Sequence, residues 1–166
     1  NIYHRNLKFH ESSEMLIKAN NLNATIYPSD YQTTVDNINK YSRIWPNTRF
    51  ISSNDINYNP APIFIVGLPR SGKSIVESIL TCNHSLIPVG ESEVFSDAID
   101  IFLSEKNIKS LHELYINKLV LNSTNASYVS NTNPINYMYS GLILTHLKES
   151  RIIYCYRNIL DNIYEM

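Results

Sequence analysis

A glycine-bracketed turn in the first half of the chain carries the residues best suited to chemistry. Gly67 and Gly72 enclose four residues, and Lys73 and Ser74 follow, so residues 67–74 match the pattern G-x-x-x-x-G-K-[ST]. Such a loop points backbone N–H groups and the start of a helix at a phosphate or a similar anion. An ordinary strand-to-helix turn explains the glycines, but not an Arg, a Lys and two Ser in the same loop. The pattern therefore predicts an anion-binding site.

The elements around this loop are expected to hold it at the edge of a sheet. Residues 63–66 form a short β-branched and aromatic run that predicts a buried strand, and an apolar pattern at helical spacing follows the loop. Residues 151–156 predict a second buried strand, which ends at Arg157. Because ligands bind at the carboxyl ends of parallel strands, we expect Arg157 to face the glycine loop.

The remaining pattern predicts the α/β class, with a P-loop-type parallel sheet flanked by helices and preceded by a short helical segment. A further short strand is expected at 127–130. Helices are expected at 7–22, 31–45, 92–103, 107–121 and 135–147, and from about residue 160. The Pro- and Asn-containing stretch 46–61 predicts a linker. We therefore expect a helical N-terminal segment with its linker over 1–59 and a partial α/β domain, truncated at its C-terminal side, over 60–166.

Composition gives little indication of a macromolecular partner. The chain has 166 residues, 43% of them hydrophobic, and a formal charge of −1, which does not suggest nucleic acid or a membrane surface as a partner. No signal-peptide pattern is seen, and no apolar run approaches the roughly 18 residues of a membrane span. Cys82 and Cys155 stand far apart, and no metal-type spacing occurs. We expect a cytoplasmic protein with reduced thiols and no metal site.

The motif residues resemble a known family. The run PIFIVGLPRSGKSIVESIL at 62–80 resembles the 5′-phosphosulfate loop of sulfotransferases that use 3′-phosphoadenosine 5′-phosphosulfate (PAPS). Gly90-Glu91 resembles the family's Gly-Glu segment, residues 133–136 the segment leading to the 3′-phosphate site, and residues 157–161 its Arg-x-Pro-x-Asp run. The most similar type is the bacterial group related to tyrosylprotein sulfotransferases. In that group tetratricopeptide repeats precede the catalytic domain, so residues 1–59 would include the end of such an array.

The resemblance implies PAPS as cofactor and a hydroxyl or amine as the acceptor of the sulfuryl group, whether on a protein, a carbohydrate or a small molecule. The residues implied to hold the 5′-phosphosulfate are Arg70, Ser71, Gly72, Lys73 and Ser74, and Arg157 is implied to hold the 3′-phosphate. Sulfuryl transfer moves a charged group between two oxygens, so charge stabilisation by Lys73 and a general base would be needed. Glu91 is the first choice for the base and Glu93 the reserve.

Four positions depart from the family pattern. Lys73 stands where the family usually has Thr or Ser, Thr132 where it often has Lys, and Ile159 where it has Pro. Glu165 stands where the family has a Ser near the 3′-phosphate, and a carboxylate there would repel a phosphate. These departures keep open a non-catalytic relative that binds a nucleotide or a partner.

A nucleoside-triphosphate-using enzyme, such as a small kinase, is a further alternative, because Lys73-Ser74 completes an ATP-type loop. Such enzymes usually need an acid at a strand end to help hold Mg²⁺. The predicted strands deliver Asn131 and Arg157 instead, which favours sulfuryl transfer. Purely structural roles are the alternatives for these residues. Glu91 and Glu93 suit the first turn of a helix, where the helix dipole favours acidic residues. Arg157 could form an ion pair with Asp161 at i,i+4 spacing.

Overall fold

The computed structural model describes residues 5–28, 30–48, 59–104, 109–119 and 126–165, with only the backbone at 164 and 165. Its chain divides into two compact units, Asn1–Asn37 and Ile38–Met166. This division falls within a helix, whereas the sequence suggests a change from helical segment to core near residue 59. The first unit holds helix α2 (Phe9–Ile26) and the beginning of α3 (Tyr31–Ile44), as the sequence predicts. No helix in the described ranges is long and apolar enough to cross a membrane.

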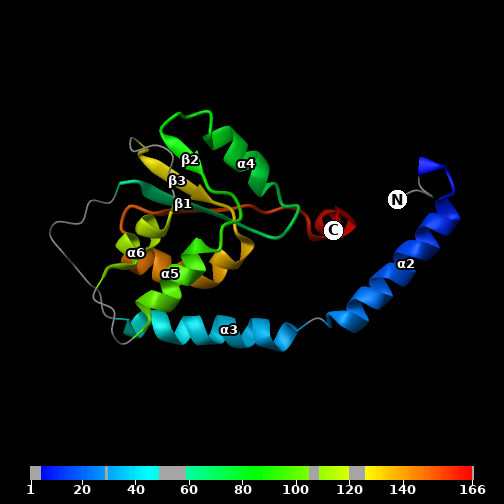
Figure 1. Ribbon diagram of the computed structural model, residues 1–166, viewed down its shortest axis with the longest axis horizontal. Coiled ribbons are helices and arrows are strands. Elements are labelled where there is room, and N and C mark those ends of the chain that lie inside the picture. The colour runs from blue at the N-terminus through cyan, green and yellow to red at the C-terminus, as the bar shows by residue number, and fades with distance from the viewer. Residues whose placement is uncertain (1–4, 29, 49–58, 105–108, 120–125, 166) are drawn as a thin grey trace. The chain divides into compact units, whose positions relative to one another are not determined.

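The second unit is built on a four-stranded sheet (Figure 1). Its strands are β1 (Ala61–Val66), β2 (Leu86–Pro88), β3 (Tyr128–Asn131) and β4 (Arg151–Tyr154), in the order β2-β3-β1-β4. All three pairings are parallel, and Phe64 of β1 lies opposite Asn131 on one side and Ile152 on the other. The predicted α/β class with a parallel sheet is confirmed.

Helices cover both faces of this sheet. Figure 1 shows α4 (Lys73–Leu80) on one face, and α5 (Val94–Phe102) and α6 (Leu111–Lys118) on the other. The chain also forms η1 (Trp45–Asn47), η2 (Pro134–Tyr139), α7 (Ser140–His146) and α8 (Ile159–Glu165). Phe64, Phe95 and Tyr115 pack as an aromatic cluster under β1, with ring centroids 4.6 to 5.8 Å apart. This core fixes β1 and therefore the loop that follows it.

Strand β4 is less buried than the sequence predicts. The run 151–156 reads as a strand covered on both faces, but β4 ends at Tyr154, and Arg151 and Tyr154 are exposed. Among the described strands β4 pairs with β1 alone, so it forms an edge of the sheet. An apolar run indicates that a strand is suited to burial, but how far the strand is buried depends on which elements cover it.

Candidate anion-binding site

The glycine loop follows β1 and adopts the backbone conformation that such loops need. Gly67, Arg70 and Gly72 all have positive φ, at 150°, 62° and 97°. A Cβ at Gly67 would overlap the carbonyl oxygen of Cys155, so glycine is needed for the ends of β1 and β4 to approach each other. Gly72 is the N-cap of α4, which places the start of that helix at the loop.

A cavity of about 480 Å³ opens at this loop. Its lining residues are Pro69, Arg70, Gly72, Lys73, Ser74, Ile75, Glu91 and Arg157. The volume falls within the range typical of small-molecule sites, roughly 300–1,000 Å³. Residues from three separate stretches of sequence, the loop, the turn after β2 and the turn after β4, are thus brought to one place. This is the carboxyl edge of the parallel strands, where the sequence predicts the site.

Two cations that line the cavity, Lys73 and Arg157, donate hydrogen bonds to carbonyl groups of the loop. Lys73 is buried, and its Nζ donates to the carbonyl oxygens of Gly67 at 3.3 Å and Leu68 at 3.4 Å. Arg157 Nη1 donates to the carbonyl oxygen of Arg70 at 3.3 Å, so Arg157 faces the loop as the sequence predicts. Burial raises the pKa of the Cys155 thiol, and the nearby Lys73 ammonium opposes that rise.

Ser71 differs from the other loop residues proposed as ligands. Gly72, Lys73, Ser74 and Arg70 line the cavity, but Ser71 is outside its lining. Ser71 donates its backbone N–H to Leu68 O at 3.2 Å, which closes the turn. Its hydroxyl oxygen is buried without a hydrogen-bond partner in the part of the chain that the structure describes. Buried polar atoms normally have hydrogen-bond partners. The unpartnered hydroxyl of Ser71 is therefore consistent with a role in binding an anion at the loop.

Backbone hydrogen bonds between the turn after β2 and the end of β3 hold the two residues that precede Glu91. Val89 N donates to Ser130 O at 2.9 Å, and Thr132 N donates to Gly90 O at 2.9 Å. These bonds continue the β2–β3 pairing past its last residue. The carbonyl group of Gly90, directly before Glu91, is therefore held in place.

Two asparagines fix the chain on the other side of Glu91. The side-chain amides of Asn131 and Asn133 donate to Ser92 O at 3.1 and 3.3 Å. Asn131 Nδ2 also lies 3.3 Å from the hydroxyl of Tyr115, whose pKa burial raises to about 12. The carbonyls before and after Glu91 are therefore both held, and its side chain lines the cavity.

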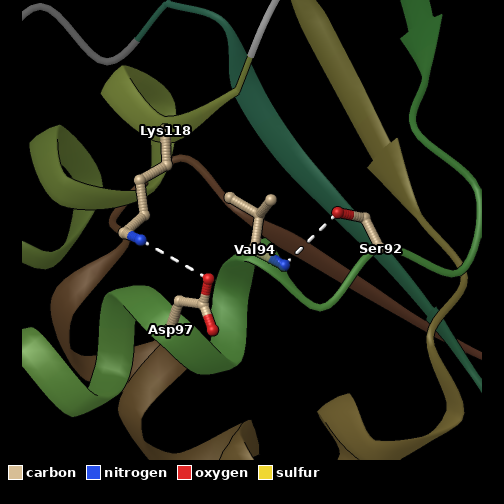
Figure 2. Close-up of polar contacts among 4 residues, drawn as sticks. All are labelled: Ser92, Val94, Asp97 and Lys118. Atoms are coloured by element: carbon tan, nitrogen blue, oxygen red, sulfur yellow. Dashed lines mark hydrogen bonds and ion pairs between the residues drawn. The ribbon is translucent and has the colours of Figure 1, made fainter.

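Figure 2 shows how the same turn leads into α5. The hydroxyl of Ser92 accepts from Val94 N at 3.3 Å, and Asp97 pairs with Lys118 of α6 at 3.4 Å. Glu93, the reserve candidate for the base, is exposed at the N-cap position of α5 and lies outside the cavity lining. Of the two glutamates, the geometry brings only Glu91 to the loop.

Two of the positions that depart from the family pattern, Thr132 and Glu165, change the charge near the expected site. Thr132, where the family often has Lys, is buried and also outside the cavity lining. Glu165 belongs to α8, but its side chain is outside what the structure describes. In the described ranges, no group of three or more His, Cys, Asp or Glu could hold a metal ion.

Sequence reasoning did not identify Asn162 as part of this region. Asn162 of α8 is 1% exposed and donates its Nδ2 to Pro69 O of the glycine loop at 3.3 Å. The chain is rich in Asn, so one more asparagine in a helix gives no signal. Only its position five residues after Arg157, in the helix that follows the predicted strand end, could have drawn attention to it.

Comparisons with known proteins leave the family open. No family model matches the chain, and no solved structure matches it at a significant level. An uncharacterized protein of Aquifex aeolicus (strain VF5) is 25% identical, in a match that covers 60% of this chain and 16% of that protein. The chain is thus similar to a small part of a much longer relative.

Proposed function

We propose that this chain is a sulfotransferase domain that binds PAPS and transfers its sulfuryl group to a hydroxyl or amine. One observation carries the proposal. Arg70, Lys73 and Arg157 line one cavity, and among the described residues Glu91 is the one carboxylate in that lining. A ligand with two separate anionic ends suits three cations supplied by two different turns, and the carboxylate remains available for a proton.

The two turns would hold the two ends of the donor. The glycine loop, with Arg70, Lys73 and Ser74, suits the 5′-phosphosulfate, because two cations and the start of α4 lie there. Arg157 suits the 3′-phosphate, because a guanidinium can bind a phosphate with two parallel hydrogen bonds. When bound, PAPS supplies an activated sulfuryl group, and adenosine 3′,5′-bisphosphate (PAP) is the product left after transfer.

Glu91 would take the proton of the acceptor. It stands between two carbonyls that are held by Thr132 N and by the amides of Asn131 and Asn133. Fixing the backbone on both sides limits where the exposed Glu91 side chain can reach, and this favours its placement at the cavity before an acceptor arrives. Arg70 and Lys73 would stabilise negative charge on the transferring group, as cations do in related transfers of charged groups.

One observation favours a second candidate, a nucleoside triphosphate as ligand. Lys73 extends back over the loop to the carbonyls of Gly67 and Leu68, so its ammonium lies close to any anion that the loop binds. A lysine placed in this way suits a β- or γ-phosphate as well as a sulfate. The candidates differ in the ligand and in the need for Mg²⁺.

The discriminating experiment is calorimetric titration of the chain with PAP and with ATP, each in EDTA and in excess Mg²⁺. Tighter binding of PAP in EDTA supports the sulfotransferase, and tighter binding of Mg-ATP supports the second candidate. Binding of neither nucleotide would contradict both. Transfer is then measured with radiolabelled PAPS against phenols, amines and carbohydrates.

A further inference from the structure

Side chains hold the carbonyl groups of the glycine loop. Its four consecutive carbonyl groups, those of residues 67–70, each accept a hydrogen bond from a side chain. Lys73 donates to the first two, Asn162 to Pro69 O and Arg157 to Arg70 O. At 3.3 to 3.4 Å these bonds are long for N–H···O contacts, so each is weak alone.

The direction of these carbonyls matters for an anion. A carbonyl oxygen carries partial negative charge, so one turned into the cavity would repel an anionic ligand. In a trans peptide group the N–H points away from the carbonyl, so a donor that holds Pro69 O turns the Arg70 N–H to the opposite side, as in other anion-binding loops. The side-chain donors therefore set the electrostatic character of the loop.

The three donors are not equivalent. Lys73 and Arg157 are cations that line the cavity, so a bound anion would compete with the loop carbonyls for their N–H groups. Asn162 is neutral, almost fully buried and outside the cavity lining, so its bond to Pro69 O can persist when a ligand binds.

The amide of Asn162 contributes more than packing. Its Oδ1 is buried and has no hydrogen-bond partner among the described residues. A buried acceptor without a partner is unfavourable, so an apolar side chain of similar size would suit simple burial better. What the amide adds is the donor to Pro69 O.

We infer that Asn162 is a positioning residue for the glycine loop, acting through Pro69 to hold the loop in its anion-binding form. The inference rests on the proposed function in that it takes the cavity to bind an anionic nucleotide. It does not depend on which nucleotide binds, so the test can separate the inference about Asn162 from the proposed function.

The test is calorimetric titration of the Asn162→Leu variant of the whole chain with PAP and with AMP. Leu keeps the branching of the side chain at Cγ and removes the donor. We expect the Kd of both ligands to rise about three- to tenfold, as for the loss of one neutral hydrogen bond. The binding stoichiometry and the preference for PAP over AMP should stay the same, because Arg157 is intact. A merely structural role would lower the stoichiometry and leave the Kd unchanged.

Two further variants guard against effects on folding. Asn158→Ala removes the bond from Leu160 N to Asn158 Oδ1 at the start of α8 without touching the loop, and it should leave the Kd within about twofold. Asn162→Gln keeps the donor on a longer side chain and should restore part of the affinity, even if the leucine variant folds poorly.

The outcomes separate this inference from the proposed function. An unchanged Kd in folded Asn162→Leu overturns the inference, and so does an equal loss in Asn158→Ala. If the wild type binds Mg-ATP but not PAP, the proposed function fails. The same weakening of Mg-ATP binding in Asn162→Leu would still support the inference. A wild type that binds neither nucleotide overturns both.

Discussion

Arg70 is expected to affect both ligand binding, through its side chain, and stability, through its backbone, and two substitutions can separate these effects. Its side chain lines the cavity, and its backbone has a φ of 62°, in the left-handed region that favours glycine. Arg70→Ala removes the guanidinium and keeps an L-residue at that φ. Arg70→Gly removes the guanidinium and also relieves the backbone.

The expected magnitudes follow from these two terms. Loss of a charged donor costs about 1.5–3 kcal/mol of binding, so both variants should bind PAP at least about tenfold more weakly. A left-handed conformation costs an L-residue roughly 1–2 kcal/mol. Glycine loses about 0.5–1 kcal/mol more than alanine to the freedom of its unfolded chain. The glycine variant should therefore be more stable than the alanine variant by about 0.5–1 kcal/mol, or about 1–4 °C in Tm for a chain of this size.

The assay combines calorimetry with PAP and thermal unfolding of both variants without ligand. Arg70→Lys is the matched control, because it keeps a charge and should retain part of the affinity. Two results would refute the reasoning. One is wild-type affinity in a folded Arg70→Ala protein, which would remove the side chain from the site. The other is equal or lower stability of Arg70→Gly, which would mean that the backbone at this position is not strained.

Three other predictions, each with a control, test the rest of the site and its surroundings. Arg157→Ala should erase most of the preference for PAP over AMP in competition binding, whereas Arg151→Ala at the opposite end of β4 should not. A preference that survives in Arg157→Ala would exclude the proposed 3′-phosphate contact. Glu91→Gln should keep the PAP affinity and lose transfer to an acceptor, and Glu93→Gln should keep both; the reverse result would make Glu93 the base. Burial lowers the pKa of His146 below its usual 6.5, so the unfolded chain binds this proton more readily, and the free energy of unfolding should fall as the pH drops from about 6.5. Urea unfolding at pH 7.5, 6.5 and 5.5 should show this slope, and His146→Gln should flatten it; an equal slope in both proteins would show that other groups cause it.

The glycine loop and the edge of the sheet could be predicted because they depend on local sequence. A β-branched run before Gly67 and a helical pattern after Gly72 specify a strand, a turn and a helix almost without tertiary information. Parallel topology then places the end of β4, and with it Arg157, beside the loop.

The finer details of the site depend on contacts across long stretches of the chain. Asn162 lies 93 residues from Pro69, and Asn133 lies 41 residues from Ser92, so no local pattern indicates either bond. The burial of a strand is equally non-local, which explains why β4 is less covered than its sequence predicts. Local sequence specifies which elements form, and their packing decides where each side chain points.

The three cations of the cavity belong to a chain whose charges nearly cancel, with 14 Lys and Arg against 15 Asp and Glu. At physiological salt, exposed charges are screened over about 8 Å. A distant anion therefore meets no net attraction, and the positive field of the cavity acts only over the last stretch of its approach. Long-range steering, which speeds the capture of ligands by highly charged proteins, has little part here. Under the proposed function, discrimination among anions must then arise at contact, from the match between an anion's shape and the spacing of the loop and Arg157.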